Sequence, residues 1–434
     1  MNTTLRTIVI TGILFCSLFA IVPVNGMPSQ HPCTTPSPSI IQMINQVNES
    51  LLFSYLNNLT AFGPRYTGSE NCTKASQYIY DEFKAIGLSV EFHDWKFDTY
   101  TSRNVVATLP GTNHSSNATF LISGHYDTVL PSPGADDDGS GAAAVLAIAN
   151  IMSKYTFNYT IRFIAFSGEE VGSYGSFSYA RDAYRSGDNI IASFDVDMIG
   201  YANTTEGGSF VRFSYPERSQ WVSETSITIS NTYHAFTNFS IEALPNYIGS
   251  DHQAFIDYGY DAVWIAHPDG YPWGHSQNDT IEHINWTYYV KATKLLIAVL
   301  GEFASTPITL QVIITAPMEG YFYLSDKPLF HLDLGKAWYK GLRGTTVLFG
   351  KTTARVNVVS DNQIKYVIFC IDGNFQFTWP SSPPYECPLE GIHYPFIGKH
   401  TLKVYAYTTT GEIATDEMDI HIYQLSSIFQ KKRG

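Results

Sequence analysis

The chain has 434 residues, of which 44% are hydrophobic and 15% are charged, so it can build a sizeable core and is too long for one ordinary domain. Its formal net charge is −13 with only 26 lysines and arginines, and no basic stripe interrupts it, so its surface would repel a phosphate backbone. We therefore expect two domains and exclude nucleic acid as a partner.

The first 26 residues have the pattern of an export signal. Arg6 supplies a positive charge, an apolar run extends from Ile8 to Val22, and Val24-Asn25-Gly26 offers small residues for cleavage. An uncleaved membrane anchor is the alternative, but this run is short of a full membrane span and later apolar runs are shorter still. We predict a signal peptide over 1–26, a secreted extracellular protein, and no membrane span after signal removal.

A proline- and serine-rich stretch over 27–37 predicts a loose leader. Beyond it, patterns of helix and strand alternate up to residue 305. Apolar positions at helical spacing predict helices over 39–59, 71–86, 140–153, 175–183 and 220–235, and β-rich runs predict strands over 88–92, 104–109, 119–123, 160–166 and 190–197. This alternation predicts an α/β fold over 38–305, with a mixed, mainly parallel sheet covered by helices on both faces.

The pattern changes after Pro307, where β-rich runs are separated by turn residues without a convincing helix. Asp372-Gly373 and Thr410-Gly411 are typical of hairpin turns. The stretch from Ile397 to Val404 resembles the closing strands of immunoglobulin-like modules. We expect an all-β, immunoglobulin-like sandwich over 306–434 that serves spacing, stability or attachment.

Cysteines and glycosylation motifs both favour an exported protein. Signal removal leaves four cysteines, which allow three connectivities. We expect Cys33–Cys72 and Cys370–Cys387 disulfides, because each pair then lies within one predicted domain. After signal removal, the remaining Asn-x-Ser/Thr motifs lie between residues 48 and 285, which supports a domain boundary near Ser305 and a glycoprotein; they are at Asn48, Asn58, Asn71, Asn113, Asn117, Asn158, Asn203, Asn238, Asn278 and Asn285.

Five separated stretches offer ligands for zinc, at 124–127, 135–139, 168–170, 195–197 and 274–276. Zinc binds imidazole and carboxylate together, and a paired site needs about five such ligands with one bridging carboxylate. His125, Glu170 and Asp197 fall at the ends of predicted strands, where α/β sheets bind ligands. A surface His-Asp pair, a solvated acidic helix cap or a loop histidine would explain single motifs, but their coincidence favours one metal site.

Two neighbouring carboxylates and a His-x-Asp pair suggest roles beyond ligation. Residues two apart in a strand face the same way, so Asp127 is placed to accept a hydrogen bond from the nitrogen of His125 that does not bind metal. Adjacent side chains point in different directions, so of Glu169 and Glu170 one can bind metal while the other reaches the metal-bound water.

Together these motifs resemble the M28 metallopeptidases, which are co-catalytic zinc aminopeptidases. The resemblance covers about residues 40–305 and rests on 124–129, 137–141, 166–172, 197–200, 250–252 and 275–276. It implies two Zn²⁺ per chain, with Asp137 as the bridging carboxylate and a cis peptide bond before Asp138. It further implies that His125 and Asp197 complete one site, that Glu170 and His275 complete the other, that Glu169 is the general base, and that Asp251 supports the ligands.

The resemblance implies a secreted zinc-dependent exopeptidase that releases N-terminal amino acids from peptide substrates, with Glu169 taking a proton from the zinc-activated water. Two positions depart from the family. Gly274 replaces a tyrosine that helps to hold the oxyanion in some members, which leaves Tyr271 or Trp273 as candidates. Gly249 replaces an arginine near the substrate's amino end, so preference for a free N-terminus is less secure than peptide hydrolysis.

Two alternatives stay open. A single-zinc glutaminyl cyclase shares this fold, but the complete Asp-Asp-Gly motif and the Glu169-Glu170 pair favour a peptidase. A non-catalytic glycoprotein would be expected to lack a ligand or Glu169, and none is missing. Serine catalysis is not considered further because the chain has no Gly-x-Ser-x-Gly motif.

Overall fold

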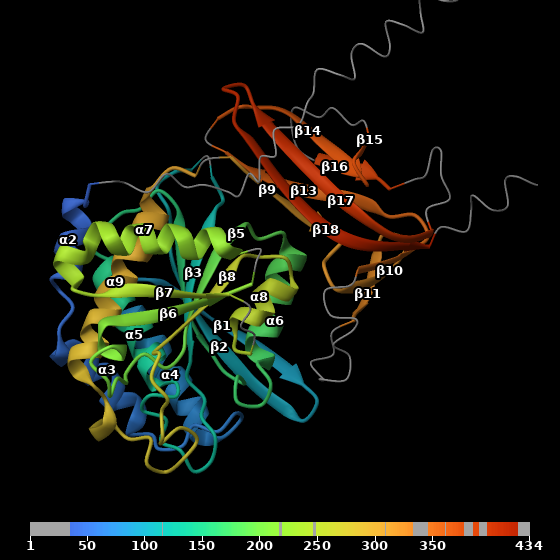
Figure 1. Cartoon of the computed structure of the whole chain (residues 1–434). Helices are drawn as coiled ribbons and strands as arrows, with labels where there is room; N and C mark the ends of the chain where they lie inside the picture. The colour runs from blue at the N-terminus through green and yellow to red at the C-terminus, as the bar shows by residue number, and fades with distance from the viewer. Residues whose placement is uncertain are drawn as a thin grey trace, which may run out of the picture.

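The computed structural model describes residues 35–423 apart from 115, 217–218, 246–248, 309, 333–345, 361, 377–384 and 390–396. The predicted signal peptide over 1–26, most of the leader and Cys33 lie outside the described residues. The described chain forms a mixed α/β part followed by an all-β part (Figure 1). The predicted fold class is therefore confirmed.

One eight-stranded sheet forms the centre of the α/β part, in the order β1-β2-β4-β3-β5-β8-β6-β7. Its central strands β4, β3, β5 and β8 are parallel, as is the edge pair β6 and β7, whereas β1, β2 and the β6–β8 junction are antiparallel. The strands are β1 (Ser89–Phe97), β2 (Tyr100–Leu109), β3 (Thr119–His125), β4 (Thr160–Phe166), β5 (Ile190–Val196), β6 (Phe210–Tyr215), β7 (Ser240–Pro245) and β8 (Ala262–Ala266).

Helices cover both faces of this sheet (Figure 1). One face carries α4 (Glu70–Ala85), α5 (Gly139–Met152), α7 (Gln220–Thr237) and α9 (Trp286–Ser305), and α2 (Pro38–Ile44) and α3 (Glu49–Thr60) pack on these helices. The other face carries α6 (Tyr174–Ser186) and α8 (His252–Asp257), and two 3-10 turns lie at η1 (Gly207–Ser209) and η3 (Ile281–His283). Among the described residues, no helix combines the length and apolar character that crossing a bilayer requires.

The structure corrects one predicted helix and adds elements that the sequence patterns did not indicate. The helix expected over 39–59 is two helices, because Asn48 starts α3 by accepting a hydrogen bond from the Leu51 backbone N–H at 3.0 Å. Helix α4 ends at Ala85, close to Gly87, which has a φ of +85°. Strands β6, β7 and β8 and helix α8 were not predicted.

The all-β part contains two sheets. The larger has the order β11-β10-β12-β18-β17-β14-β15 and the smaller the order β16-β13-β9. Asp372 and Gly373 form the predicted tight turn, both with positive φ, and the turn at 410–411 joins the last two strands. The strands are β9 (Gln311–Ala316), β10 (Tyr321–Leu324), β11 (Lys327–His331), β12 (Thr346–Phe349), β13 (Thr353–Val359), β14 (Ile364–Ile371), β15 (Asn374–Gln376), β16 (Tyr385–Pro388), β17 (Ile397–Thr408) and β18 (Ile413–Tyr423).

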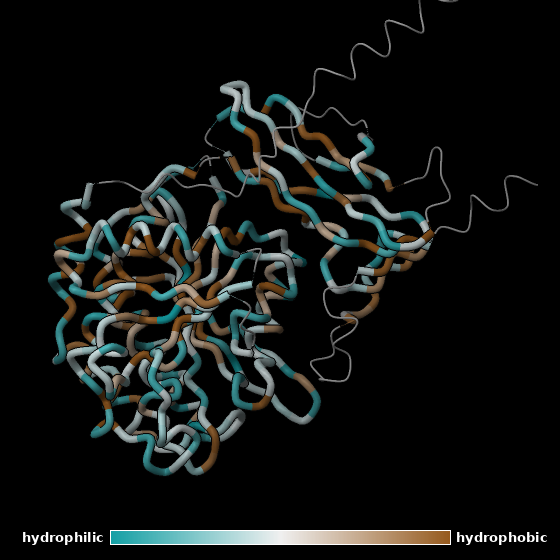
Figure 2. Tube along the Cα trace, viewed as in Figure 1, coloured by the Kyte–Doolittle hydropathy of each residue, from teal (hydrophilic) through white to brown (hydrophobic). Residues whose placement is uncertain are grey.

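The two parts share a hydrophobic core. Buried residues of α6 and α8, such as Ala180 and Phe255, belong to the same cluster as Val312 and Ile314 of β9. In Figure 2, hydrophobic residues line the central sheet of the α/β part and recur along the strands of the all-β part. Polar contacts join the parts as well, including a 2.6 Å hydrogen bond between the Tyr258 and Tyr321 hydroxyls. The all-β part is therefore packed against the α6 and α8 face of the sheet.

The predicted disulfide between Cys370 and Cys387 is wrong. Both thiols are free and buried, and they lie on β14 and β16, which belong to different sheets. Cys72 is also a free thiol, with its Sγ 3.7 Å from the Ser102 hydroxyl oxygen, while its predicted partner Cys33 lies outside the described residues. Shared membership in a domain did not place the Cys370 and Cys387 side chains within bonding geometry.

Candidate metal centre

The carboxyl ends of three neighbouring parallel strands, β4, β3 and β5, meet at one edge of the sheet. Strand β3 ends at His125, the turn after β4 carries Glu169 and Glu170, and Asp197 directly follows β5. Parallel strands deliver the residues at their carboxyl ends to a common crevice, which is where open α/β sheets bind ligands. The strand pattern therefore explains why these segments, far apart in the sequence, come together.

Asp137 lies between two histidines. Its Oδ1 is 3.4 Å from His125 Nε2 and its Oδ2 is 3.1 Å from His275 Nε2. On the first side, Asp197 Oδ1 lies 3.6 Å from His125 Nε2. On the second side, Glu170 Oε2 lies 3.1 Å from His275 Nε2. We call the first set (His125, Asp137, Asp197) the inner group and the second set (Asp137, Glu170, His275) the outer group.

The two groups differ in their access to solvent. The side chain of His125 is 1% exposed, whereas that of His275 is 63% exposed. Hydrogen bonding to Asp137 is the main factor that raises the pKa of His275 to about 9. Burial works to raise the pKa of Asp137, but the two histidines outweigh burial and lower it. The Asp137 carboxylate thus attracts positive charge, as a metal ligand does.

Asp138 approaches the inner group but has a different role. Its carboxylate lies within 4.8 Å of the ligand atoms of His125 and Asp197. However, its Oδ2 accepts the backbone N–H of His125 at 3.0 Å, and its Oδ1 accepts those of Gly141 at 2.7 Å and Met198 at 3.0 Å. These hydrogen bonds cap α5 and tie it to β3 and β5, so Asp137 is the better ligand. The peptide bond between Asp137 and Asp138 is cis.

Asp279 fixes the backbone at Asp137, and the sequence analysis did not identify it. Its Oδ1 accepts the N–H of Asp136 at 2.8 Å and its Oδ2 accepts that of Asp137 at 3.2 Å. The Tyr271 hydroxyl also donates to Asp279 Oδ1, at 2.6 Å. This contact engages one of the two candidate oxyanion residues, and the other, Trp273, stacks on His283 with ring centroids 3.6 Å apart.

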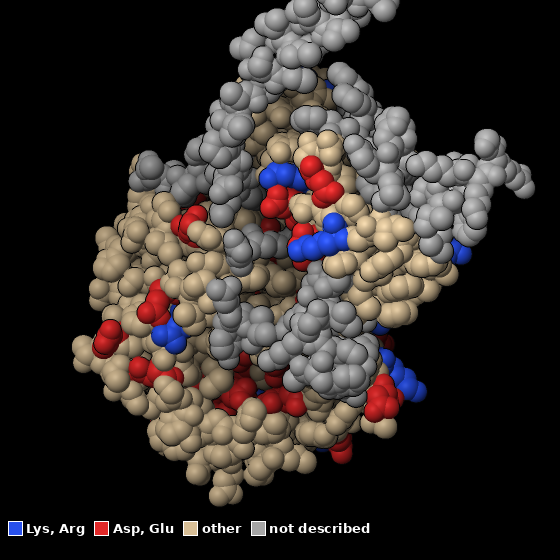
Figure 3. Space-filling model, turned by 45° about the vertical axis from the view of Figure 1, so that its right-hand side comes forward, with Lys and Arg blue, Asp and Glu red and all other residues tan. Residues whose placement is uncertain are grey.

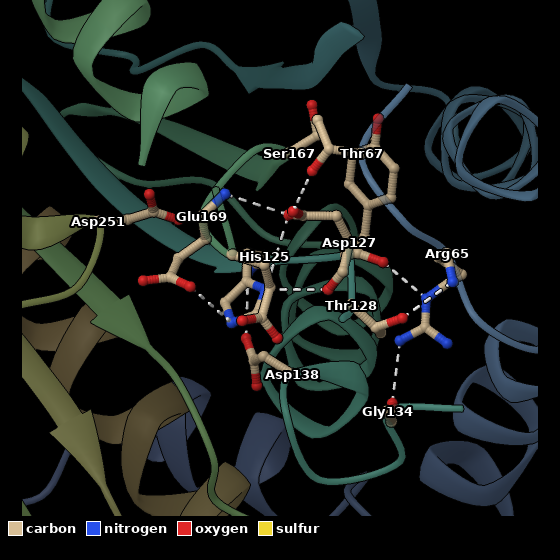
Figure 4. Close-up of polar contacts among 12 residues, drawn as sticks. Arg65, Thr67, His125, Asp127, Thr128, Gly134, Asp138, Ser167, Glu169 and Asp251 are labelled. Carbon is tan, nitrogen blue, oxygen red and sulfur yellow. Dashed lines mark hydrogen bonds and ion pairs between the residues drawn. The ribbon is translucent and has the colours of Figure 1, made fainter. Parts of the chain in front are cut away.

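His125 is oriented through Asp127, mainly by its main chain. The Nδ1 atom of His125 lies 3.1 Å from the Asp127 carbonyl oxygen and 3.7 Å from its carboxylate Oδ1. The Asp127 carboxylate instead accepts the Thr67 hydroxyl at 2.6 Å and the Glu169 backbone N–H at 3.3 Å (Figure 4). Asp127 therefore connects the first histidine to the turn that carries Glu169.

Glu169 points toward the inner group, with its Oε2 3.9 Å from His125 Nε2 (Figure 4). Burial is the main factor that raises the pKa of Glu169 well above its usual value, His125 opposes that rise, and the charges of Asp251 and Asp197 add to it. A carboxyl group in this environment accepts a proton more readily than one in water. Glu170 is also affected, since burial raises its pKa to about 7.

A glycine makes the turn before Glu169 possible. Gly168 has a φ of +85°, and a Cβ at this position would meet the ring of Trp95 at 2.5 Å. The indole N–H of Trp95 donates to Ser167 Oγ at 3.1 Å and keeps the ring in place. Glycine at position 168 is therefore required both by the backbone conformation and by the lack of space for a Cβ.

The donor set fits divalent zinc. Glu170 Oε1 and Asp197 Oδ1 are buried acceptor atoms without a hydrogen-bond partner among the described residues. The other oxygen of Asp197 accepts the Ser250 hydroxyl at 2.9 Å and the Trp264 indole N–H at 3.1 Å, which orients the free oxygen. Buried carboxylates without partners are costly, and a cation bound among carboxylate and imidazole ligands removes this cost.

Asp251 lies near Glu169 (Figure 4), but among the described residues it makes no hydrogen bond to a predicted ligand. It is fully buried, and it accepts the Ser176 hydroxyl at 2.5 Å, which links α6 to the start of α8. Burial raises the pKa of Asp251 well above its usual value. It influences Glu169 through charge, whereas Ser250 is the residue of this motif that holds a ligand.

Comparison with known proteins agrees with these residues. Residues 104–300 match the model of peptidase family M28. A probable leucine aminopeptidase of Arthroderma otae is 25% identical over 302 residues, which cover 65% of this chain and 80% of that protein. The match to the family includes every predicted ligand.

Solved structures share the fold of the α/β part. The LapA aminopeptidase of Legionella pneumophila has a TM-score of 0.57 at 19% identity, covering 64% of this chain and 77% of its own. BSAP, a zinc aminopeptidase from Bacillus subtilis, has a TM-score of 0.53 at 18% identity, with 60% and 96% covered. A Bacteroides thetaiotaomicron glutaminyl cyclase reaches 0.51 at 19%, with 58% and 97% covered. At these identities the likeness concerns the fold alone.

Proposed function

Because residues 104–300 match the model of peptidase family M28, we propose that this chain is a zinc-dependent exopeptidase that releases N-terminal amino acids from peptides. In this proposal a peptidase domain over 38–305 carries the chemistry and a β-sandwich domain over 306–434 supports it. The names of the relatives favour aminopeptidase activity over other peptidase activities.

Two zinc ions would be held around Asp137. The inner group would hold one ion through His125 and Asp197, and the outer group the other through Glu170 and His275, with Asp137 shared by both. When bound, the ions supply Lewis acidity, which lowers the pKa of a water molecule and polarises the scissile carbonyl. The observation that carries this proposal is that the two oxygens of Asp137 face different histidines.

Glu169 would move the proton. Its carboxylate faces the inner group, and its backbone is held by Asp127. As the attacking water forms its bond to the carbonyl carbon, Glu169 takes the water's proton on a carboxylate oxygen. It then gives the proton to the amine nitrogen as the C–N bond breaks. The raised pKa of Glu169 suits both halves of this transfer, because the group must accept and release a proton.

The negative surface is compatible with substrates that carry a protonated amino terminus. The chain has a net charge of −13, and Figure 3 shows acidic side chains over the α/β part, several of them gathered in the lower half of that face. Such a potential raises the local concentration of cationic ligands and falls with added salt. This supports an amino end, and not a carboxylate end, as the group that enters the site.

We further propose export of the chain by its first 26 residues, and N-glycosylation at exposed motifs. Asn117 and Asn203 are among the exposed candidates. By contrast, the Asn158 side-chain amide donates to the Ser305 carbonyl, and the Asn285 side chain caps α9 while its amide donates to the Ala202 carbonyl. Peptide mapping by mass spectrometry should find glycans at exposed motifs and unmodified asparagine at 158 and 285.

The decisive experiment combines metal analysis with a substrate panel. Purified full-length mature protein is loaded with zinc, and bound zinc is counted by atomic absorption. The panel contains aminoacyl chromogenic amides, the same peptides with blocked amino ends, and peptides with N-terminal glutamine. We expect two ions, hydrolysis of free-amino substrates, and loss of activity with chelator.

The other outcomes separate the alternatives. One ion with cyclisation of N-terminal glutamine would indicate a glutaminyl cyclase. Hydrolysis of blocked peptides only would refute the aminopeptidase assignment while leaving peptide hydrolysis intact. Absence of bound zinc and of turnover would leave the non-catalytic glycoprotein.

A further inference from the structure

Arg65 is a fully buried arginine that binds main-chain carbonyl groups. Its side chain donates to the carbonyl oxygens of Tyr126 at 2.6 Å and Pro133 at 2.6 Å. It also donates to the carbonyl oxygen of Gly134 at 2.9 Å (Figure 4). No carboxylate of the described residues forms an ion pair with it. Burying a charged guanidinium group costs free energy, and these hydrogen bonds to carbonyl oxygens must offset that cost.

These carbonyls lie in the loop that separates two ligand-bearing segments. Tyr126 directly follows His125, and Pro133 and Gly134 closely precede Asp137. Three hydrogen bonds from one planar group therefore set the distance between the start and the end of this loop. Lysine could not reproduce them, because its three donors share one nitrogen.

The loop packs tightly around the guanidinium group of Arg65. A Cβ at Gly134 would lie 2.2 Å from the Thr128 methyl group, 2.6 Å from the Asp137 carbonyl oxygen and 3.0 Å from an Arg65 nitrogen. The backbone of Arg65 also pairs with Thr128, since its N–H donates to Thr128 Oγ1 at 2.9 Å and its carbonyl accepts the Thr128 N–H at 3.3 Å. Arg65 is thus packed as a fixed part of this loop.

A second contact from the same segment reaches the proton-transfer residue. The Thr67 hydroxyl donates to Asp127 Oδ2 at 2.6 Å, and Asp127 Oδ1 accepts the Glu169 N–H at 3.3 Å. The main chain of Asp127 also accepts the contact from His125 Nδ1. Residues 65–67 therefore touch the supports of His125, Asp137 and Glu169 at once.

We propose that Arg65 is a positioning residue that holds the two segments bearing His125 and Asp137 at the separation that zinc binding requires, with Thr67 aiding it through Asp127. The inference rests on the proposed function, since it concerns the same centre. It assigns part of the active site to a segment that precedes the matched region 104–300. Arg65 also brings positive charge near the carboxylates of Asp279, Asp127 and Asp138.

The test compares Arg65→Lys and Arg65→Met with Arg162→Lys in the full-length protein. Arg162 serves as the control arginine, because it is partly buried and its side chain is hydrogen-bonded to Asp188 and Tyr179, but it lies near the start of β4, at the end of the strand opposite Glu169. Zinc loss to a chromogenic chelator gives the rate of metal release, and initial rates give kcat and KM separately.

We expect both Arg65 variants to release zinc faster by about 10-fold to 100-fold, the range found when groups that support metal ligands are removed. We expect kcat to fall by a similar factor while KM changes little, and Arg162→Lys to match the unaltered protein in both measurements. If Arg65→Lys folds and keeps the unaltered rates of zinc release and turnover, the proposal is wrong.

Thr67→Val keeps the test decisive if the Arg65 variants do not fold. Valine preserves the shape of threonine but cannot donate to Asp127, so zinc release should quicken and kcat should fall while the melting temperature changes little. A drop in melting temperature with unchanged zinc release and kcat would mean that residues 65–67 only stabilise the fold. If the unaltered protein itself binds no zinc, it is the proposed function that fails.

Discussion

The Oδ2 atom of Asp137 and the Nε2 atom of His275 lie 3.1 Å apart, although the Asp137 side chain is 9% exposed and that of His275 is 63% exposed. The partner of Asp137 on the other side, His125, is 1% exposed. Asp137 therefore lies between a buried histidine and an exposed one. If Asp137 bridges two zinc ions as proposed, this asymmetry predicts that the two ions differ in how readily they leave.

Removing the open histidine should remove one ion. In His275→Ala the outer group loses a ligand while the inner group is intact, so zinc content after dialysis should fall from two ions to about one. Asp137→Asn should weaken both sites. Atomic absorption measures the content, and His234→Ala, at an exposed position of α7, is the control. Two retained ions in His275→Ala would contradict the assignment of this ligand.

Glu169→Gln should separate metal binding from proton transfer. The amide has nearly the shape of the carboxylate but cannot take a proton, so zinc content should stay at two while kcat falls by about 10²-fold to 10⁴-fold. Glu91→Gln on the exposed edge strand β1 should behave as the unaltered protein. A zinc-loaded Glu169→Gln variant with full turnover would assign the proton transfer to another group.

Zinc binding should release protons, among them those held by the outer group. The pKa of Glu170 is raised to about 7 by burial, and that of His275 to about 9 by hydrogen bonding to Asp137. Below these values each group holds a proton that zinc must displace, so zinc affinity should rise as pH increases from about 6 to 9. Calorimetric titration in two buffers of different ionisation enthalpy measures the released protons. Affinity that is independent of pH across this range would contradict these protonation states.

The candidate ligands could be predicted because each lies in a local pattern with a physical meaning. His125 and Asp197 end or follow β-rich runs, and Glu169-Glu170 follows another and is preceded by a glycine. Strand ends bring such residues together without any further information. The supports of the site could not be predicted in this way. Arg65 and Asp279 bind main-chain groups, which exist at every position and leave no pattern in the sequence.

The remaining errors have one local cause and two causes in long-range geometry. The helix break at Asn48 had a signal, since asparagine often precedes a helix, but the continuous apolar spacing on either side outweighed it. The pairing of Cys370 with Cys387 used sequence position alone, and the fold places them on different sheets. The core shared by the two parts could not be predicted, because α6 has an ordinary apolar face and its sequence pattern does not indicate which surface covers it.

The buried thiols should react slowly until the protein unfolds. Burial raises the pKa of both Cys370 and Cys387 to about 11, so almost none of either is thiolate at neutral pH. Iodoacetamide should label them only in denaturant, and there without a reductant, since no disulfide joins them. Peptide mapping reads out each site separately. If labelling required prior reduction, Cys370 and Cys387 would be joined by a disulfide, contrary to the structure.

The raised pKa values of these thiols also predict how the free energy of unfolding depends on pH. Their folded pKa of about 11 lies above the ordinary value of 9.0, so the folded protein holds more protons than the unfolded one between these values. Their contribution is therefore complete below about pH 9 and is lost as pH rises toward 11. Urea titrations at pH 8 and 10 should show a lower free energy of unfolding at pH 10. Cys370→Ala/Cys387→Ala should reduce this difference, and an unchanged difference would assign it to other groups.

Deleting residues 306–434 should destabilise the α/β part of the chain, even though every candidate ligand remains. The deletion exposes Phe255 and neighbouring apolar residues of α6 and α8, which share a core with the β-sandwich. Burial of apolar area is the main source of folding stability, so the truncated chain should melt at lower temperature and aggregate. Tyr321→Phe is the mild counterpart, because it keeps the ring and removes the hydroxyl that contacts Tyr258 at 2.6 Å, which should cost about 1 kcal/mol. A truncated chain that stays monomeric and melts at the unaltered temperature would show that the β-sandwich contributes nothing to the stability of the peptidase part.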